Sequence, residues 1–145
     1  MRYPELMIAP MRKELTRLGI EELMTPEDVD AFLEKANGET AMIVINSMCG
    51  CAAGSMRPGV ATALEHNVRP AHMATVFAGQ EVEATARARE YIVGYPPSSP
   101  SIALFKDGKP VFMLERHQIQ DVQPLEIADK LMQAFDEHCA EAVEG

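Results

Sequence analysis

Apolar positions along the chain follow two spacings, which predict strands alternating with helices. The apolar run at 41–45 predicts a central strand over 41–47 that is buried on both faces, and residues 71–77 predict a second strand. Two further strands, 101–106 and 110–115, flank Asp107-Gly108, a strong signal for a two-residue hairpin turn. Helical spacing of apolar residues predicts helices at 4–18, 26–36, 51–66, 80–91 and 121–143.

Individual residues refine the ends of these helices. Pro10 should break the first helix, because proline lacks the backbone N–H that a helix interior uses. Thr25 is an expected N-cap, followed by Pro26 in the first turn of the second helix. Pro58-Gly59 lies inside the 51–66 segment and should kink or divide it.

The order of these elements indicates an α/β fold. Strand, helix, strand, helix, hairpin and final helix is the order of the thioredoxin fold, here with a helical N-terminal extension over 1–38 and a core over 41–145. We expect one domain, 1–145, with a central mixed four-stranded sheet flanked by helices. A right-handed crossover should make 71–77 parallel to 41–47, with 101–106 antiparallel on the other side and Pro110 on an edge strand.

Composition narrows the classes of partner. The net charge is −9 and the basic residues are scattered, so no basic stripe is available for nucleic acid. No apolar run approaches membrane-spanning length, which argues against a membrane partner and favours a cytoplasmic protein. Three cysteines, two of them nearly adjacent, do not form a secreted disulfide framework and fit reactive thiols in a reducing compartment. Composition does not indicate an oligomeric state.

The triplet Cys49-Gly50-Cys51 carries the clearest chemical signal. It follows the central strand, and a helix starting there would favour the thiolate form of cysteine through its free N–H groups and dipole. A disulfide across one residue closes a very small ring, for which Gly50 would supply backbone freedom. Such a bond should be strained and easily reduced, so the pattern predicts redox or thiol-transfer chemistry.

Two segments resemble known proteins. Residues 98–108 look like the thioredoxin segment that carries a cis-proline before the third strand, with Pro100 at the matching position. Residues 46–54, followed by Arg57-Pro58, resemble the bacilliredoxin family, thioredoxin-fold proteins with Cys-X-Cys in place of Cys-X-X-Cys. The resemblance extends to residues 10–15 and 95–101 and covers nearly the whole chain.

The resemblance implies removal of bacillithiol, a low-molecular-weight thiol, from protein mixed disulfides. Cys49 would be the attacking nucleophile, and Cys51 or a second thiol would resolve the adduct. Ser99 and cis-Pro100 would bind substrate, because a cis bond turns the backbone of Ser99 toward the thiol, where an extended segment could pair with it. No resident cofactor is expected; bacillithiol is a co-substrate, and the partners are bacillithiolated or disulfide-containing client proteins.

Several alternatives stay open at this point. Arg57 either supports the site, by attracting an anionic thiol substrate or by lowering the pKa of Cys49, or is a solvated helix residue. Cys139 is either a small buried hydrophobe or a third redox thiol. Two rival functions are a protein disulfide isomerase that uses a Cys49–Cys51 disulfide, and a metal-binding protein in which Cys139 or a histidine completes the ligand set.

Overall fold

A mixed five-stranded sheet forms the centre of the fold. The computed structural model describes residues 3–140 and orders the strands β1-β3-β2-β4-β5. Their bounds are β1 (Glu21–Glu22), β2 (Thr40–Asn46), β3 (His72–Phe77), β4 (Ser101–Lys106) and β5 (Lys109–Leu114). As predicted, β2 is parallel to β3 and antiparallel to β4, and Pro110 lies on the edge strand β5. The four-stranded prediction missed β1, which adds two residues parallel to β3.

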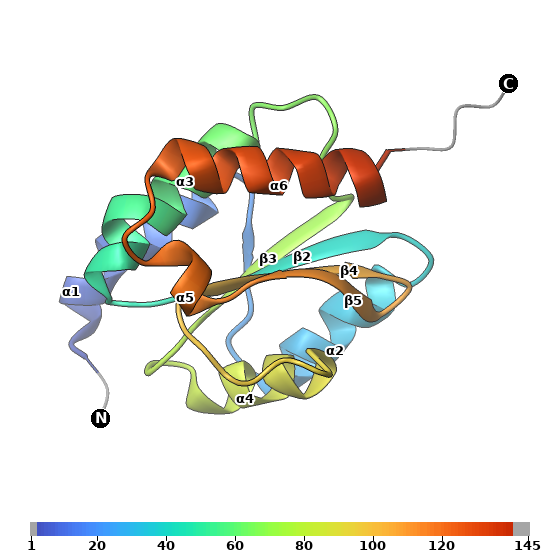
Figure 1. Cartoon of the computed structure of the whole chain (residues 1–145). Helices are drawn as coiled ribbons and strands as arrows, with labels where there is room; N and C mark the ends of the chain where they lie inside the picture. Colours follow the sequence, from blue (N-terminus) through green and yellow to red (C-terminus); the bar gives the residue numbers. More distant parts are fainter. Residues whose placement is uncertain (1–2, 141–145) are drawn as a thin grey trace, which may run out of the picture.

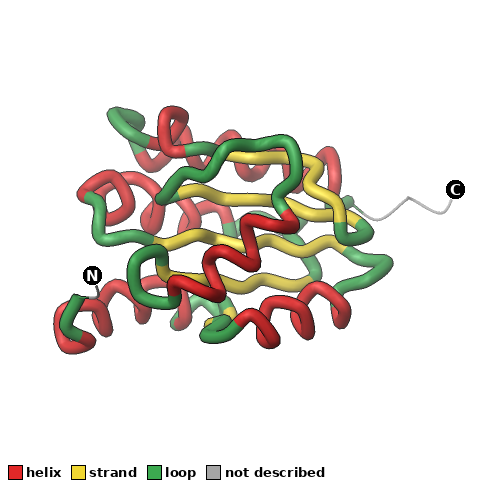
Figure 2. The backbone as a smooth tube through the Cα atoms, turned by 90° about the horizontal axis from the view of Figure 1, so that it is seen from below, coloured by secondary structure: helices red, strands yellow, loops and turns green. Residues whose placement is uncertain are grey.

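Helices cover both faces of this sheet. They are α1 (Glu5–Thr16), α2 (Pro26–Lys35), α3 (Arg57–Ala63), α4 (Val82–Tyr91), α5 (Arg116–Ile119) and α6 (Pro124–His138), with the π-helical segment η1 (Ala52–Met56) before α3. In Figure 1, α1, α3 and α6 lie on one face, and α2 and α4 on the other. Figure 2 looks onto the face covered by α2 and α4. Among residues 3–140, no helix is long and apolar enough to cross a membrane.

Strand β2 is buried along its whole length because both of its faces meet apolar layers. Successive side chains of a strand point to opposite faces. Met42 and Val44 therefore join the core on the α3–α6 side, whereas Ile43 and Ile45 join the core beneath α2 and α4. This arrangement confirms the prediction of a central strand covered on both sides.

The N-terminal helices agree with the sequence in one detail and differ in another. Thr25 caps α2 as predicted: its hydroxyl accepts a hydrogen bond from the Asp28 N–H, and the Asp28 carboxylate accepts one from the Thr25 N–H. The predicted break at Pro10 is wrong, since α1 is continuous through it. Proline removes only the bond to the Leu6 carbonyl, and Leu6 is exposed at 92%, so water can bond that carbonyl instead.

The helix after β2 begins at Gly50 and ends at Ala63, before the predicted end. The π-helical segment η1 lies before the Pro58-Gly59 pair. There the Arg57 N–H donates to the Ala52 carbonyl five residues back, and Pro58 has no N–H to donate. Gly59 allows a close approach of α6: a Cβ there would lie 2.8 Å from Ile127 Cβ. This contact holds α3 against α6.

The C-terminal part contains an element that the sequence did not predict. The four-residue helix α5 follows β5 directly, and α6 begins at Pro124 rather than at Asp121. Helix α4 similarly begins at Val82 instead of at 80. Residues 141–143 of the predicted final helix lie outside the described residues. The hairpin prediction is confirmed, with positive φ at both Asp107 and Gly108.

Candidate active site

The segment between β2 and the following helix is held by buried polar contacts. The Asn46 amide donates to the Met11 carbonyl, and its oxygen accepts from the Ser47 N–H at 2.9 Å. The Ser47 hydroxyl then accepts from the Cys49 N–H at 3.0 Å. The Cys49 carbonyl accepts from the N–H groups of Ala52 and Ala53, which places Cys49 at the N-terminus of the helix, as predicted.

Arg57 belongs to this support and not to a solvated helix face. Its side chain is 2% exposed, and its Nη1 donates to the Asn46 side chain at 2.9 Å and to the Ser47 carbonyl at 3.0 Å. Its Nε lies 3.2 Å from a carboxylate oxygen of Glu14. The predicted solvated role is therefore wrong. Arg57 is also not among the main causes of the lowered pKa of Cys49, so we interpret it as a residue that positions the loop.

The two cysteine sulfurs are adjacent and chemically unequal. The Sγ atoms of Cys49 and Cys51 share a hydrogen bond at 2.8 Å, and both residues are half-buried. The pKa of Cys49 is lowered, first by the hydrogen bond from Cys51 and then by the N–H groups of Cys51 and Ala52 and the charge of Arg116, against the opposing effect of burial. Burial and the neighbouring Cys49 thiolate raise the pKa of Cys51. Cys49 is therefore the more acidic thiol of the pair and Cys51 the less acidic one.

Gly50 adopts a backbone conformation that does not require glycine, contrary to expectation. Its φ lies outside the left-handed region, and an added Cβ would meet no atom within 4 Å. The structure therefore gives no steric reason for glycine between the two thiols when they are reduced.

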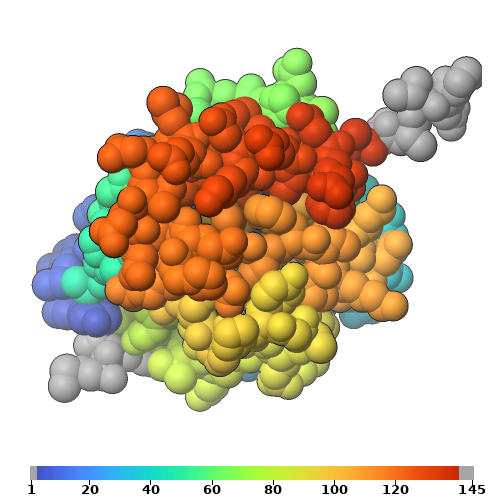
Figure 3. Space-filling view, in the orientation of Figure 1, coloured from blue at the N-terminus to red at the C-terminus, as the bar shows by residue number. Residues whose placement is uncertain are grey.

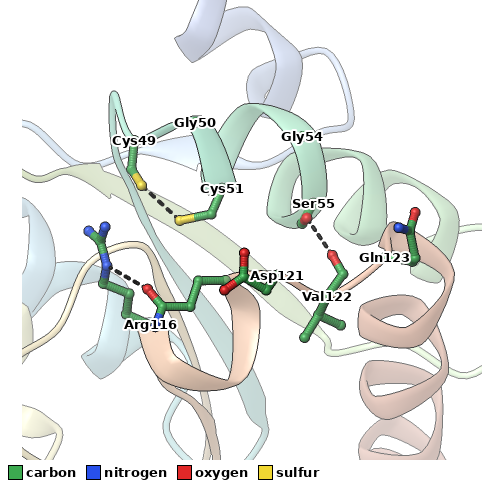
Figure 4. Close-up of a pocket in the computed structure, with 10 residues that line it drawn as sticks. Cys49, Gly50, Cys51, Gly54, Ser55, Arg116, Asp121, Val122 and Gln123 are labelled. Carbon is green, nitrogen blue, oxygen red and sulfur yellow. Dashed lines mark hydrogen bonds between the residues drawn. The ribbon is translucent and has the colours of Figure 1, made fainter.

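Arg116 is the cation beside the cysteine pair, and sequence reasoning missed it. It is the first residue of α5, and its guanidinium donates to the Ser99 carbonyl at 3.0 Å and to the Gln120 side chain. Figure 4 shows Arg116 and Asp121 across the hollow from the two sulfurs. No periodic pattern marked this position; it reaches the site only because the β4–β5 hairpin brings the chain back to the end of the sheet.

The hollow in front of Cys51 has a volume of about 470 Å³. The helix that carries the cysteines forms one wall, and the chain from Arg116 to Gln123 forms the other. The hydroxyl of Ser55 donates to the Val122 carbonyl and joins the two walls. In Figure 3 the turquoise atoms of the cysteine helix reach the surface between the blue α1 and the orange α5 region. Cys49 and Cys51 both line the hollow and are only half-buried.

The Ser99–Pro100 peptide bond is cis, in agreement with the prediction. Ser99 and Cys49 line the same second hollow. The Ser99 carbonyl already accepts a hydrogen bond from Arg116, however, and is not wholly free for a substrate strand.

Cys139 lies far from the other two cysteines. It follows α6 and borders a hollow with Thr40 and Lys106, at the opposite end of β2 from Cys49. It is half-buried against the core, and burial raises its pKa. Within residues 3–140, no three His, Cys, Asp or Glu side chains are grouped to hold a metal ion, and Cys139 does not complete a ligand set with the pair.

Comparison with known proteins connects this geometry to a class. The family model described as "Disulphide isomerase" matches residues 3–139. A bacilliredoxin of Salinibacter ruber is 53% identical over 97% of this chain and 84% of its own, and one of Cytophaga hutchinsonii is 55% identical over 93% and 98%. Among solved structures, Fasciola hepatica thioredoxin has a TM-score of 0.59 at 22% identity, covering 82% of this chain and 99% of that one.

The fold and the paired thiols therefore define a thiol-disulfide oxidoreductase with a thioredoxin fold. The solved thioredoxins establish the fold alone, because their sequences are distant. The identity to the two relatives is far higher and extends over nearly the whole chain. The chain belongs to the bacilliredoxin family.

Proposed function

We propose that the protein removes bacillithiol from protein mixed disulfides through Cys49. The asymmetric thiol pair carries this proposal: the pKa of Cys49 is lowered and that of Cys51 is raised across one sulfur–sulfur hydrogen bond. The thiolate is the nucleophile in thiol–disulfide exchange. The name of the relatives points to bacillithiol as the thiol that is transferred.

The exchange proceeds in two steps of disulfide transfer. The Cys49 thiolate bonds to the bacillithiol sulfur, the bond from that sulfur to the client breaks, and the client cysteine leaves as a thiolate that takes a proton from water. Cys51 or an external thiol then attacks Cys49 and releases bacillithiol. Cys51 lies near enough to do this, since its Sγ is 2.8 Å from that of Cys49. We further propose that this takes place in the cytoplasm, where thiols are kept reduced.

Mass spectrometry of the intact protein tests the proposal. The protein is incubated with a bacillithiolated client, and the adduct is located in the wild type and in Cys49→Ser and Cys51→Ser variants. We expect an adduct on Cys49 that is transient in the wild type and persists in Cys51→Ser. An adduct that forms as fast in Cys49→Ser would reverse the roles of the two cysteines.

General protein disulfide exchange is the second candidate. The description of the matching family names disulphide isomerase, and the two sulfurs are close enough to cycle between dithiol and disulfide. Rates on a bacillithiolated client and on a protein with scrambled disulfides separate the two functions, because they differ in substrate more than in chemistry. Faster turnover of the scrambled protein would favour the isomerase.

A further inference from the structure

A second hollow lies on the other side of Cys49. Its volume is about 530 Å³, and its lining includes Ser47, Cys49, Arg89, Ser99 and Arg116; we refer to it as the Arg89 groove. Arg89 comes from α4 and Arg116 from α5, so two separate elements bring an arginine to a hollow that Cys49 also lines. Hollows of this size accommodate small molecules.

The two hollows that flank Cys49 differ in charge. The one in front of Cys51 contains the carboxylate of Asp121 as well as Arg116. The lining of the Arg89 groove contains two arginines and no aspartate or glutamate. This difference is notable in a chain with 22 acidic residues against 13 basic ones. An anion approaching Cys49 is therefore favoured on the Arg89 side.

The two arginines of the groove are not neutralised by the protein, whereas others are. Arg12, Arg57 and Arg87 each form an ion pair with a carboxylate. Within residues 3–140, neither Arg89 nor Arg116 has a carboxylate partner; both donate instead to backbone carbonyls at the Ser98–Ser99 turn.

Arg89 is the more costly of the two to leave unpaired. Its Nε is buried and has no hydrogen-bond partner in the described structure, and burial lowers its pKa. Because a partly desolvated cation is destabilised until it meets an anion, a carboxylate bound there would recover some of this loss.

We propose that the Arg89 groove binds the carboxylate of an anionic low-molecular-weight thiol while Cys49 attacks the sulfur of that thiol. This inference rests on the proposed function and adds its specificity determinant: the small thiol, and not the client, is recognised by charge. In the step it assists, the bond between the small thiol and the client breaks, a bond from that thiol to Cys49 forms, and the client leaves as a thiolate, with no net oxidation.

The test uses one neutral reporter peptide with a single cysteine, joined by a disulfide either to mercaptosuccinate or to 2-mercaptoethanol. The measured quantity is the ratio of the two rate constants for peptide release, anionic thiol over neutral thiol. Changes in the nucleophilicity of Cys49 cancel in this ratio, because the same thiolate attacks both substrates. Arg89→Gln should lower the ratio roughly three- to fivefold, and Arg89→Lys should retain most of it.

Arg69→Gln is the charge-matched control. Arg69 is exposed and borders the hollow that contains Cys139, at the opposite end of the sheet, so the ratio should not change. In the wild type the ratio should fall when salt is raised to about 0.5 M, which tests the groove even if a variant folds poorly. An Asp-flanked peptide carrying 2-mercaptoethanol serves as a third substrate.

The outcomes separate this inference from the proposed function. Adduct formation on Cys49 with an unchanged ratio in Arg89→Gln would overturn the groove assignment alone. A rate gain for the Asp-flanked peptide that depends on Arg89, without a gain for mercaptosuccinate, would assign the groove to the client and also overturn it. Absence of any Cys49 adduct would refute the proposed function itself.

Discussion

Arg57 is the residue whose replacement tests the site most directly. In Arg57→Met the apolar stem is kept, and the guanidinium contacts to Asn46, Ser47 and Glu14 are lost. Because the side chain is 2% exposed, water cannot easily replace these contacts. Two hydrogen bonds from a charged donor and one ion contact together amount to about 3–4 kcal/mol.

We therefore expect Arg57→Met to lower the free energy of unfolding by about 3 kcal/mol in urea and the melting temperature by about 10 °C. Arg57→Lys should lower the free energy of unfolding nearly as much, because the lysine ammonium is a single point charge and cannot reproduce the hydrogen bonds of the planar guanidinium. Glu14→Gln is the control for the ion contact alone and should cost about 1 kcal/mol or less, since Glu14 is 36% exposed.

The Arg57→Lys variant also distinguishes support of the loop from direct activation of the thiol. If Arg57 acted on Cys49 through its charge, Arg57→Met would raise the pKa of Cys49 and Arg57→Lys would restore it. Our reasoning is refuted by that pattern, or by an Arg57→Met protein whose stability differs from the wild type by less than about 1 kcal/mol.

Three further predictions concern the cysteines and the helix that carries two of them. Iodoacetamide modification of Cys49 should show its inflection below the pH of an ordinary free cysteine, and Cys51→Ala should move it upward, because the hydrogen bond that lowers the Cys49 pKa most is lost; an inflection that stays in place would contradict this account. Cys139 should react slowly at neutral pH, since burial raises its pKa, and labelling as fast as that of Cys49 would show it to be exposed. Gly59→Ala should be about 1–3 kcal/mol less stable in urea denaturation than Gly54→Ala, because only the first Cβ clashes with α6; equal stabilities would mean that α6 moves aside freely.

Local signals explain why much of the fold could be predicted. The N-cap at Thr25, the Asp107-Gly108 turn and the continuous burial of β2 depend on neighbouring residues, and each is confirmed. The two-residue β1 has no apolar pattern, since both of its residues are glutamates, and only its pairing with β3 defines it.

The site could be predicted only where its residues are close in sequence. The spacing of Cys49 and Cys51 marks them as a candidate site, and the Pro100 segment is recognised by its likeness to thioredoxin. Arg116 is 67 residues after Cys49, and nothing in its neighbourhood marks it as a partner of a thiol. For Arg57 the sequence left two roles open, because a charged residue in a predicted helix is usually solvated, and only the contacts to the Asn46 side chain and the Ser47 carbonyl decide between them.

The wall formed by the chain from Arg116 to Gln123 makes the completion of the site depend on a segment far along the chain from the cysteines. A nascent chain that ends before α5 already contains both thiols of the pair but lacks the cation beside them and the Ser55–Val122 clasp. Its Cys49 would lack the charge of Arg116, which is one of the lesser causes of the lowered pKa of that thiol. The second wall of the thiol site therefore exists only after the segment that follows β5 has been made and has folded back onto the cysteine helix.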